Sequence, residues 1–403
     1  MRLPDFDRGI LLSALILVGM GVFMVYSATA VMAMRSDGGD FAFLGRHLVS
    51  VGVGLVALLC SMFMDYRYLR RFSIVLLIGA FALVLLVFVP GLGVSANGAR
   101  RWIRLWPSTF QPSELAKLAL VVFLADYASR PFRSQVARGM NAAHAIRRKM
   151  EHPVSGFLVP LSAMLMIQAV LIAQPDFGAF MSIGILGLSM LFLAGARLRY
   201  FLMLVPVGLP AVLYLLRTPY RLRRVTAFLD PWKDVHGSGY QLVQSLLSFG
   251  NGGLFGTGLG EGRQKLFFLP EPHTDFIFSM IGEELGFVRV LPVVFLFLYI
   301  LYRGYRIAGQ AQDPFGQLLA LGLTLMLALQ ALFHMAVTTG LLPTKGLPLP
   351  FVSYGGSSLM VSLTATGILL SISRYREVRG AAVRRPNFRN QRAIPRRVGY
   401  RNA

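Results

Sequence analysis

The sequence predicts an all-α, polytopic membrane protein with about ten membrane-spanning helices. Of its 403 residues, 55% are hydrophobic and only 14% are charged, whereas about a quarter of the residues in soluble domains are charged. The apolar residues fall into blocks about as long as a membrane span. Lys and Arg residues are concentrated in alternate connecting segments, which is the pattern expected of a multi-pass protein of the cytoplasmic membrane.

Ten apolar segments account for the predicted helices. They cover approximately residues 9–34, 47–64, 72–90, 113–129, 154–173, 176–196, 198–217, 276–302, 316–340 and 355–373. The first segment could be mistaken for a secretory signal peptide, because Ala28-Thr29-Ala30 mimics a cleavage site. Its apolar run is longer than the roughly 7–15 residues of such a peptide, so we expect a retained membrane helix.

The distribution of Lys and Arg predicts that both termini are cytoplasmic. In this orientation more than half of the 40 basic residues lie in cytoplasmic segments, namely the N-terminus, 65–71, 130–153, 197–199, 303–315 and the tail from Arg374. The outward segments are then 91–112, 341–354 and a large loop, 218–275, between the seventh and eighth helices. The stretch AHAIRRKM within 130–153 is expected to form a short helix at the membrane surface.

The sequence divides into one transmembrane domain, residues 1–375, and a tail, residues 376–403. The tail is rich in Arg, Asn and Pro with little apolar content, so we expect it to be disordered and cytoplasmic. The net charge of +22 could suggest a nucleic-acid partner. In a membrane protein, cytoplasmic loop bias and attraction to anionic membrane lipids explain the charge better, and we expect no nucleic acid.

Several functional classes lack support in the sequence. The single cysteine, Cys60, lies within an apolar block, so there is neither a disulfide framework nor a thiolate zinc site. The sequence contains no Walker lysine motif, no HExxH and no G-x-S-x-G. Nucleotide hydrolysis, zinc proteolysis and esterase chemistry are therefore not indicated.

The first outward loop combines arginines with aromatic residues. Arg100, Arg101 and Arg104 alternate with Trp102 and Ile103. One interpretation is an interfacial belt at the end of a helix. The other is a cationic, aromatic wall that binds a diphosphate or the face of a sugar. The sequence pattern alone does not decide between them.

Two polar groups follow at the start of the next helix. Glu114 and Lys117 are three residues apart and share one helix face. They could be a first-turn acid with a paired lysine, but Lys117 is deep for a snorkelling residue, which favours a functional role. In the tight turn 174–176, Asp176 is expected to cap the following helix rather than to act in catalysis.

The large outward loop opens with Arg221, Arg223 and Arg224. The stretch GYQLVQSLLSFGNGG has helical spacing and could lie on the outer leaflet. The glycine-rich GNGGLFGTGLGEG does not follow a strand, so we expect a flexible, closely packing loop rather than a dinucleotide site. In the last outward segment, Pro343, Pro348 and Pro350 interrupt the helix. Irregular backbone at membrane depth usually lines a cavity, so this segment is expected to shape a pocket wall.

Residues 270–287, PEPHTDFIFSMIGEELGF, place ionisable groups next to and within an apolar run. His273, Thr274 and Asp275 come before the run, and Glu283 and Glu284 lie inside it. Ionisable groups at membrane depth are costly and are usually functional. The alternative for Asp275 is an ordinary helix N-cap.

The order of the motifs resembles the SEDS family, which contains FtsW and RodA. The motifs are NGARRWI, FQPSELAK, QPDFG, PEPHTDFIFSMIGEELG and GLLPTKGLPLPFVSYGGSS, and the resemblance covers about residues 9–375. Gly282 and Thr344-Lys345-Gly346 resemble the division branch more than the elongation branch. Two residues depart from the family pattern and bear on local packing: His334 stands where asparagine is usual, and Arg289 where glycine is usual.

This resemblance implies a peptidoglycan glycosyltransferase that polymerises lipid II at the outer face of the bacterial cytoplasmic membrane, at the division septum. It also implies a class B penicillin-binding protein and other division proteins as partners. The catalytic aspartate of the family falls on Asp275. We expect substrate contacts from Arg101, Trp102, Glu114, Lys117, His273, Thr274, Lys345 and Ser353. The sequence shows no dedicated metal cage, although Mg²⁺ or Mn²⁺ could help to neutralise the diphosphate.

Two alternatives stay open. In a lipid II flippase, Glu114, Lys117, Glu283 and Glu284 would line a polar path through the bundle. In a non-enzymatic scaffold of the division machinery, the same residues would be structural. Glycan chains made from lipid II in detergent would require the enzyme, whereas head-group translocation without polymer would favour the flippase.

Overall fold

The computed structural model describes residues 6–33, 42–96, 99–105, 108–131, 140–216, 219–264 and 273–375. The predicted tail, residues 376–403, and residues 97–98 and 106–107 of the first outward loop lie outside these ranges. The elements of the first half are α1 (Arg8–Ala33), α2 (Ala42–Phe63), α3 (Arg67–Arg71), α4 (Ser73–Leu86), β1 (Gly93–Ala96), β2 (Ala99–Leu105), β3 (Ser108–Phe110), α5 (Pro112–Ser129), α7 (Ala142–Met150), η1 (Pro153–Leu158) and α8 (Val159–Ala173). The second half has α9 (Phe177–Leu193), α10 (Leu198–Leu216), α11 (Pro219–Leu229), η2 (Pro231–Asp234), α12 (Tyr240–Gly252), α13 (Ile277–Gln310), α14 (Pro314–Thr338) and α15 (Gly356–Arg374).

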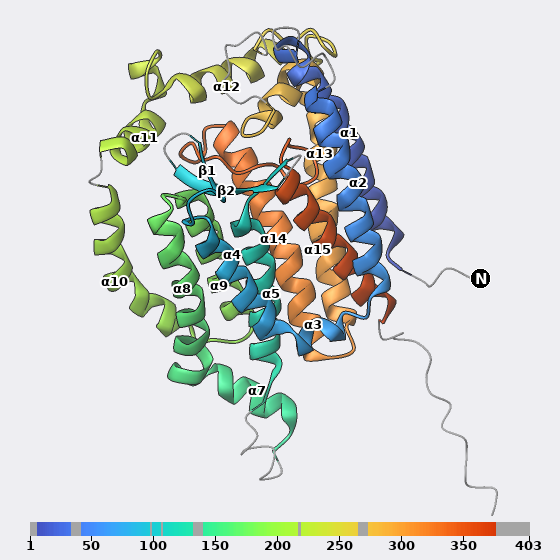
Figure 1. The fold of residues 1–403 in the computed structure, drawn as a ribbon, viewed down its shortest axis with the longest axis vertical. Coiled ribbons are helices and arrows are strands. Elements are labelled where there is room, and N and C mark those ends of the chain that lie inside the picture. Colours follow the sequence, from blue (N-terminus) through green and yellow to red (C-terminus); the bar gives the residue numbers. More distant parts are fainter. Residues whose placement is uncertain are drawn as a thin grey trace, which may run out of the picture.

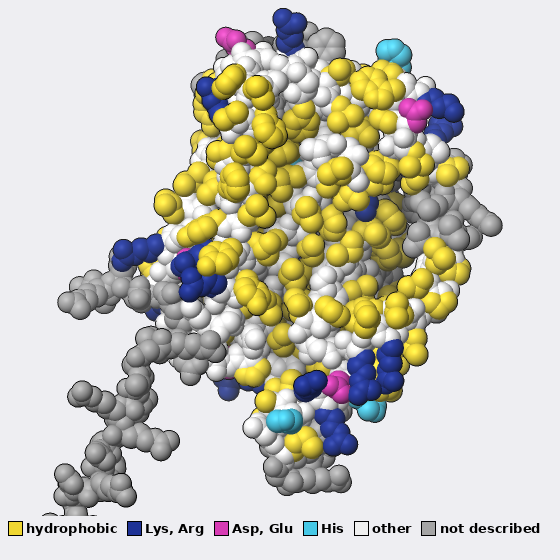
Figure 2. All heavy atoms as spheres, turned by 180° about the vertical axis from the view of Figure 1, so that it is seen from behind, with side chains coloured by type: hydrophobic (Ala, Val, Ile, Leu, Met, Phe, Trp, Pro, Cys, Tyr) yellow, Lys and Arg dark blue, Asp and Glu magenta, His cyan; other side chains and the backbone are white. Residues whose placement is uncertain are grey.

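All ten predicted apolar segments are helical, which confirms the polytopic helical fold. Within the described residues, six helical segments are long and apolar enough to cross a membrane, and two apolar helices, Ser73–Leu86 and Phe177–Leu193, are shorter. The count of ten crossings therefore stays a prediction. Hydrophobic side chains cover most of the middle of the face shown in Figure 2, and most Lys and Arg side chains on it lie toward the lower part and the edges.

Helix α5 is the centre of the bundle. It packs against α4, α9, α14 and α15, and most of its side chains are buried. In Figure 1, α1, α2, α13 and α15 lie to one side of α5, and α8, α9 and α10 lie to the other. The mixture of charged and apolar residues on α5 follows from this position, because its polar groups meet protein rather than lipid.

The segments predicted to be cytoplasmic meet at one end of the molecule. Arg303 forms an ion pair with Asp7, and the Asp7 amide donates to Ser373 Oγ over 3.1 Å. Arg67 donates to Gln312 Oε1 over 2.8 Å. The sheet, α11 and α12 lie at the opposite end (Figure 1). The fold therefore supports the predicted grouping of the loops, and α7 confirms the short helix expected within 130–153.

The outward loop 91–112 contains a small sheet that the all-α prediction missed. Strands β1, β2 and β3 pair antiparallel in this order. On β2, Ile103 is buried and Arg104 is exposed, as the period of two in a strand requires. The arginines interspersed with Trp102 and Ile103 were the available signal, but the pattern suggested an interfacial belt or a ligand-binding wall rather than a strand.

The glycine-rich loop packs on a kink in α13. Gly286 has φ 75° and ψ 172° inside the helix, a conformation that is nearly restricted to glycine. A Cβ added at Gly286 would overlap the backbone of Gly256, and one added at Gly256 would overlap the carbonyl of Glu284. The close packing expected of this loop is thus confirmed. Its neighbour α12 is confirmed as a helix, and it packs on α13.

Replacing Gly286 by alanine is expected to destabilise the protein by about 1–3 kcal/mol or more, because the backbone conformation is strained for alanine and the neighbouring atoms are backbone. Gly309→Ala, in the same helix, is the matched control, since no other atom lies within 4 Å of the added Cβ. Thermal melting in detergent measures both variants. Equal melting temperatures for the two would contradict the packing argument.

Candidate active site

The carboxylate of Asp275 lies beside the backbone of the last outward segment. Asp275 belongs to the turn before α13, and the N-cap position of that helix is Phe276, which makes no side-chain cap. A Cβ added at Gly346 would be 2.8 Å from Asp275 Oδ2. The glycine therefore permits the approach of the carboxylate to the 344–347 backbone.

Hydrogen bonds fix the backbone immediately before Asp275. The amide of Tyr354 donates to the carbonyl of His273 over 2.9 Å. Ser353 Oγ donates to the carbonyl of Thr274 over 2.7 Å and accepts from the Leu349 amide over 2.8 Å. The predicted site residues His273, Thr274 and Ser353 therefore come together, and the buried hydroxyl of Ser353 positions the backbone next to Asp275.

An aromatic cluster covers this turn. The rings of His273 and Tyr354 pack edge-on with centroids 5.3 Å apart. Phe43 of α2 contacts both of these rings, and the ring of His47, one turn further along α2, packs against Tyr354. The outer end of α2 thus contributes to the site, a contribution that the sequence analysis missed.

Lys345 supplies a cation next to the contact between Asp275 and Gly346. Its Nζ lies 5.0 Å from the centroid of the Phe177 ring, which is cation–π range. Burial lowers the pKa of the Lys345 ammonium, because a low-dielectric environment disfavours the charged form. An anion bound beside Lys345 would stabilise the charged ammonium and so compensate for the hydration that burial removes.

Arg101 reaches the same region through the 174–178 turn. Its guanidinium donates to the Pro175 carbonyl, and its Nη1 is 3.9 Å from Asp176 Oδ1. A Cβ added at Gly178 would be 3.7 Å from the Gly346 carbonyl oxygen, so this turn and the Lys345 segment are neighbours. Asp176 also accepts from the Ala179 amide over 3.1 Å, which confirms the expected helix cap.

Trp102 is placed differently from Arg101. Adjacent residues of a strand project from opposite faces, and both residues lie in β2. The face of β2 that carries Arg101 meets the 174–178 turn, so Trp102 projects away from it. A wall that uses both side chains would have to contact its ligand from two faces of the sheet.

Glu114 and Lys117 form a buried ion pair, as expected from their spacing. Their charged atoms are 2.8 Å apart, and their exposed fractions are 3% and 2%. Lys117 Nζ also donates to Gln330 Oε1 over 2.7 Å. Gln330 Nε2 in turn donates to the Pro348 carbonyl over 3.0 Å and to Ser358 Oγ over 2.9 Å. The pair thus anchors the segment that carries Lys345 and Gly346.

Gln330 is a site-supporting residue that the sequence analysis missed. A glutamine inside an apolar helix is unusual enough to be a signal. His334, one of the two departures from the family pattern, lies one turn further on, and its Nδ1 is 2.7 Å from the Leu347 carbonyl oxygen. Both side chains of α14 therefore hold the 347–348 backbone, while the buried Nε2 of His334 has no hydrogen-bond partner among the described residues.

Glu283 and Glu284 support the glycine-rich loop. Both are fully buried. Glu283 accepts from the amides of Arg263 and Gln264 over 3.0 and 3.3 Å. Glu284 accepts from the Gly260 amide over 3.1 Å and from Ser27 Oγ over 2.6 Å. The structure therefore gives both carboxylates loop-binding contacts, and it shows neither of them beside Asp275.

The structure places none of the three arginines at the start of the large outward loop beside Asp275. The side chains of Arg221 and Arg224 lie outside the described residues, and Arg223 is exposed. In the part of the chain that the structure describes, no group of three or more His, Cys, Asp or Glu residues could hold a metal ion.

Taken together, the fold and the site define a multi-pass helical membrane protein with a carboxylate, Asp275, and two cations, Arg101 and Lys345, gathered at its outward end. A family model described as FtsW, RodA and SpoVE cell cycle proteins matches residues 8–378. The chain belongs to this family, which confirms the SEDS resemblance.

The relatives agree with this membership. A Geobacter (strain M18) protein named probable peptidoglycan glycosyltransferase FtsW is 45% identical over 382 residues, covering 94% of this chain and all of that protein. Stage V sporulation protein E of Bacillus subtilis is 41% identical over 370 residues, covering 92% and 97% of the two chains. These relatives support the division-type, FtsW-like resemblance.

Two solved structures have the same fold. RodA of Thermus thermophilus superposes with a TM-score of 0.65 at 29% identity, covering 92% of this chain and 98% of that chain. A chain from a structure described as the structural coordination of polymerization and crosslinking by a peptidoglycan synthase complex has a TM-score of 0.73 at 28% identity, covering 93% and 99%.

Proposed function

We propose that this chain is a peptidoglycan glycosyltransferase that polymerises lipid II at the outer face of the cytoplasmic membrane, with Asp275 as the catalytic base. The observation that carries the proposal is the placement of the Asp275 carboxylate against Gly346, with Lys345 next in sequence to that glycine and Arg101 of β2 in contact with the adjoining 174–178 turn. Family membership and the names of the relatives support the same activity.

The chemistry follows from these groups. Asp275 takes the proton from a hydroxyl of the acceptor sugar. The hydroxyl oxygen attacks the anomeric carbon of the donor, a new glycosidic bond forms, and the bond to the lipid diphosphate breaks. Lys345 and Arg101 neutralise the departing diphosphate, an electrostatic contribution that grows as the bond breaks. If a Mg²⁺ or Mn²⁺ ion binds, the Asp275 carboxylate would hold it, and the ion would supply further positive charge for the departing diphosphate.

The buried charged residues that suggested a flippase make contacts within the protein instead. Glu114 pairs with Lys117, and Glu283 and Glu284 bind the glycine-rich loop. A transport path would need polar groups that face a passage. The arrangement therefore favours polymerisation over translocation.

A class B penicillin-binding protein at the division septum is the partner that we propose. The structural neighbour from a complex that coordinates polymerization with crosslinking supports a partner of this kind. The proposed function is tested by incubating the purified chain with fluorescent lipid II, with and without the partner, and separating the products by size. Glycan chains are expected. Head-group translocation in liposomes without polymer would overturn the proposal.

Arg101→Ala is expected to reduce polymerisation at limiting lipid II by about 10-fold or more, because a charge-assisted contact to the diphosphate would be lost. The control is Arg104→Ala, which removes the same charge from the opposite face of β2. Initial rates over a range of lipid II concentrations separate binding from turnover. Equal loss in both variants would show that only the overall charge of the loop matters.

Truncation after Tyr375 is expected to leave polymerisation unchanged, because the basic tail carries little apolar sequence and is predicted to lie on the side opposite Asp275. The truncated protein should differ only in localisation or partner recruitment. The polymerisation assay on well-folded truncated protein measures this, and a loss of glycan synthesis would contradict the domain assignment.

A further inference from the structure

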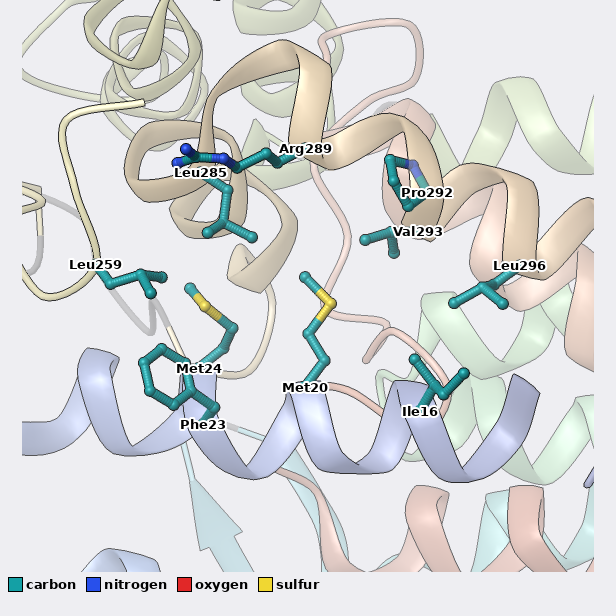
Figure 3. Close-up of a pocket in the computed structure, with 10 residues that line it drawn as sticks. All are labelled: Ile16, Met20, Phe23, Met24, Leu259, Leu285, Arg289, Pro292, Val293 and Leu296. Carbon is teal, nitrogen blue, oxygen red and sulfur yellow. The ribbon is translucent and has the colours of Figure 1, made fainter. Parts of the chain in front are cut away.

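An apolar groove lies between α1 and α13, away from the Asp275 site. Its volume is about 310 Å³, at the lower end of the range for small-molecule sites. Its walls are Ile16, Met20, Phe23, Met24, Leu259, Leu285, Arg289, Pro292, Val293 and Leu296. Figure 3 shows the α1 side chains facing those of α13 across the groove, with Leu259 of the glycine-rich loop at one end. None of these residues belongs to the site around Asp275.

Arg289 is the single charged residue of the lining. Its side chain is exposed, and its Nη1 donates to the Phe255 carbonyl over 3.2 Å. A guanidinium has five N–H donors, so this contact leaves donors for a ligand. In Figure 3 the guanidinium lies above Leu285, at the end of the groove nearest Leu259.

The depth of Arg289 in the membrane follows from α13. Arg289 comes shortly after the Gly286 kink, and Arg303 lies further along the same helix, paired with Asp7 at the predicted cytoplasmic end. The 14 intervening steps correspond to about 21 Å along the helix. The hydrocarbon core is about 30 Å thick, so the backbone of Arg289 lies in the outer half of the membrane, and its long side chain can extend toward the outer boundary, where lipid phosphates are found.

We propose that this groove binds one anionic phospholipid of the outer leaflet, with an acyl chain between α1 and α13 and the phosphate on Arg289. The apolar walls disfavour a soluble anion, because such an anion would lose its hydration against hydrocarbon side chains. A single cation matches a phosphodiester with one negative charge better than a polyprenyl diphosphate, which would need more than one cationic partner. The bound lipid would bridge α1, α13 and the loop at Leu259.

Native mass spectrometry of the purified full chain tests the proposal. The protein is mixed with equal amounts of phosphatidylglycerol and phosphatidylcholine that carry the same acyl chains. The wild type is expected to retain one phosphatidylglycerol in preference to phosphatidylcholine. Arg289→Gln should lower this retention by roughly 10-fold or more, the change expected on losing a charge-assisted hydrogen bond. Lys233→Gln, at another exposed outward cation, should leave it unchanged.

The apolar half of the site is tested separately. Met20→Trp should fill the groove and lower retention, whereas Leu12→Trp, at an exposed position of α1 outside the groove, should not. Retention that does not distinguish the two phospholipids, or that survives both Arg289→Gln and Met20→Trp, would overturn the proposal. Complete displacement of phosphatidylglycerol by an equal concentration of undecaprenyl diphosphate would also overturn it, by assigning the groove to a diphosphate lipid.

Discussion

Replacing Asp275 by asparagine is expected to lower glycan synthesis by about 10²–10⁴-fold, the range for the loss of a general base. Asparagine has nearly the shape of aspartate, so the contact with Gly346 should survive. It cannot accept a proton from a sugar hydroxyl at neutral pH. Expression, membrane insertion and melting temperature should therefore stay near those of the wild type. The measurement is polymer yield from lipid II, together with a melt of the same preparation.

The matched control is Asp234→Asn. Asp234 is an exposed outward aspartate that accepts from Ser238, so the same change of charge there should leave the polymerisation rate unaltered. If the Asp275 variant polymerised at the wild-type rate, the carboxylate that acts as base would have to be sought at Glu114, Glu283 or Glu284. The buried contacts of these three residues make each of them a poor candidate.

Replacing Lys117 by methionine is expected to destabilise the protein by about 3–5 kcal/mol, because it leaves the buried carboxylate of Glu114 without its partner. Gln330 would lose its bond to Lys117 as well, and the segment that carries Lys345 would loosen. Glycan synthesis should fall together with stability. The melting temperature in detergent and the polymerisation rate are the two measurements.

A double-mutant cycle separates the pair from its surroundings. Glu114→Gln combined with Lys117→Met removes both charges, so the double variant should be more stable than the sum of the two single losses predicts. Simple additivity would show that the two residues do not interact.

The sequence predicted the membrane fold well because hydropathy is a local property. Each apolar block identifies its own helix, and Lys and Arg indicate the side of each loop. The small sheet was missed because β1 and β3 are only a few residues long and because Arg and Trp in β2 suggested ligand chemistry. Strand pairing depends on residues that are not adjacent in the sequence.

The candidate site was predicted as a set of residues, but its geometry was not. The contact between Asp275 and Gly346 joins segments about 70 residues apart, and no periodicity predicts it. Glu283 and Glu284 drew attention as charges in an apolar run, yet their contacts are with amides of a loop whose course the sequence does not give. Gln330 was not predicted as part of the site, because one glutamine side chain in an apolar helix does not indicate which distant residues it will bond.

The close backbone contact between the glycine-rich loop and the kink of α13 limits which substitutions these segments can accept. At Gly252, Gly256 and Gly286 the obstructing atoms belong to the opposing backbone, so a second substitution nearby cannot make room for a side chain. An overlap with a side chain can be relieved by a smaller residue at that neighbouring position, whereas an overlap with backbone atoms cannot. In a library of random variants selected for function, these three positions should remain glycine even when the residues around them change freely.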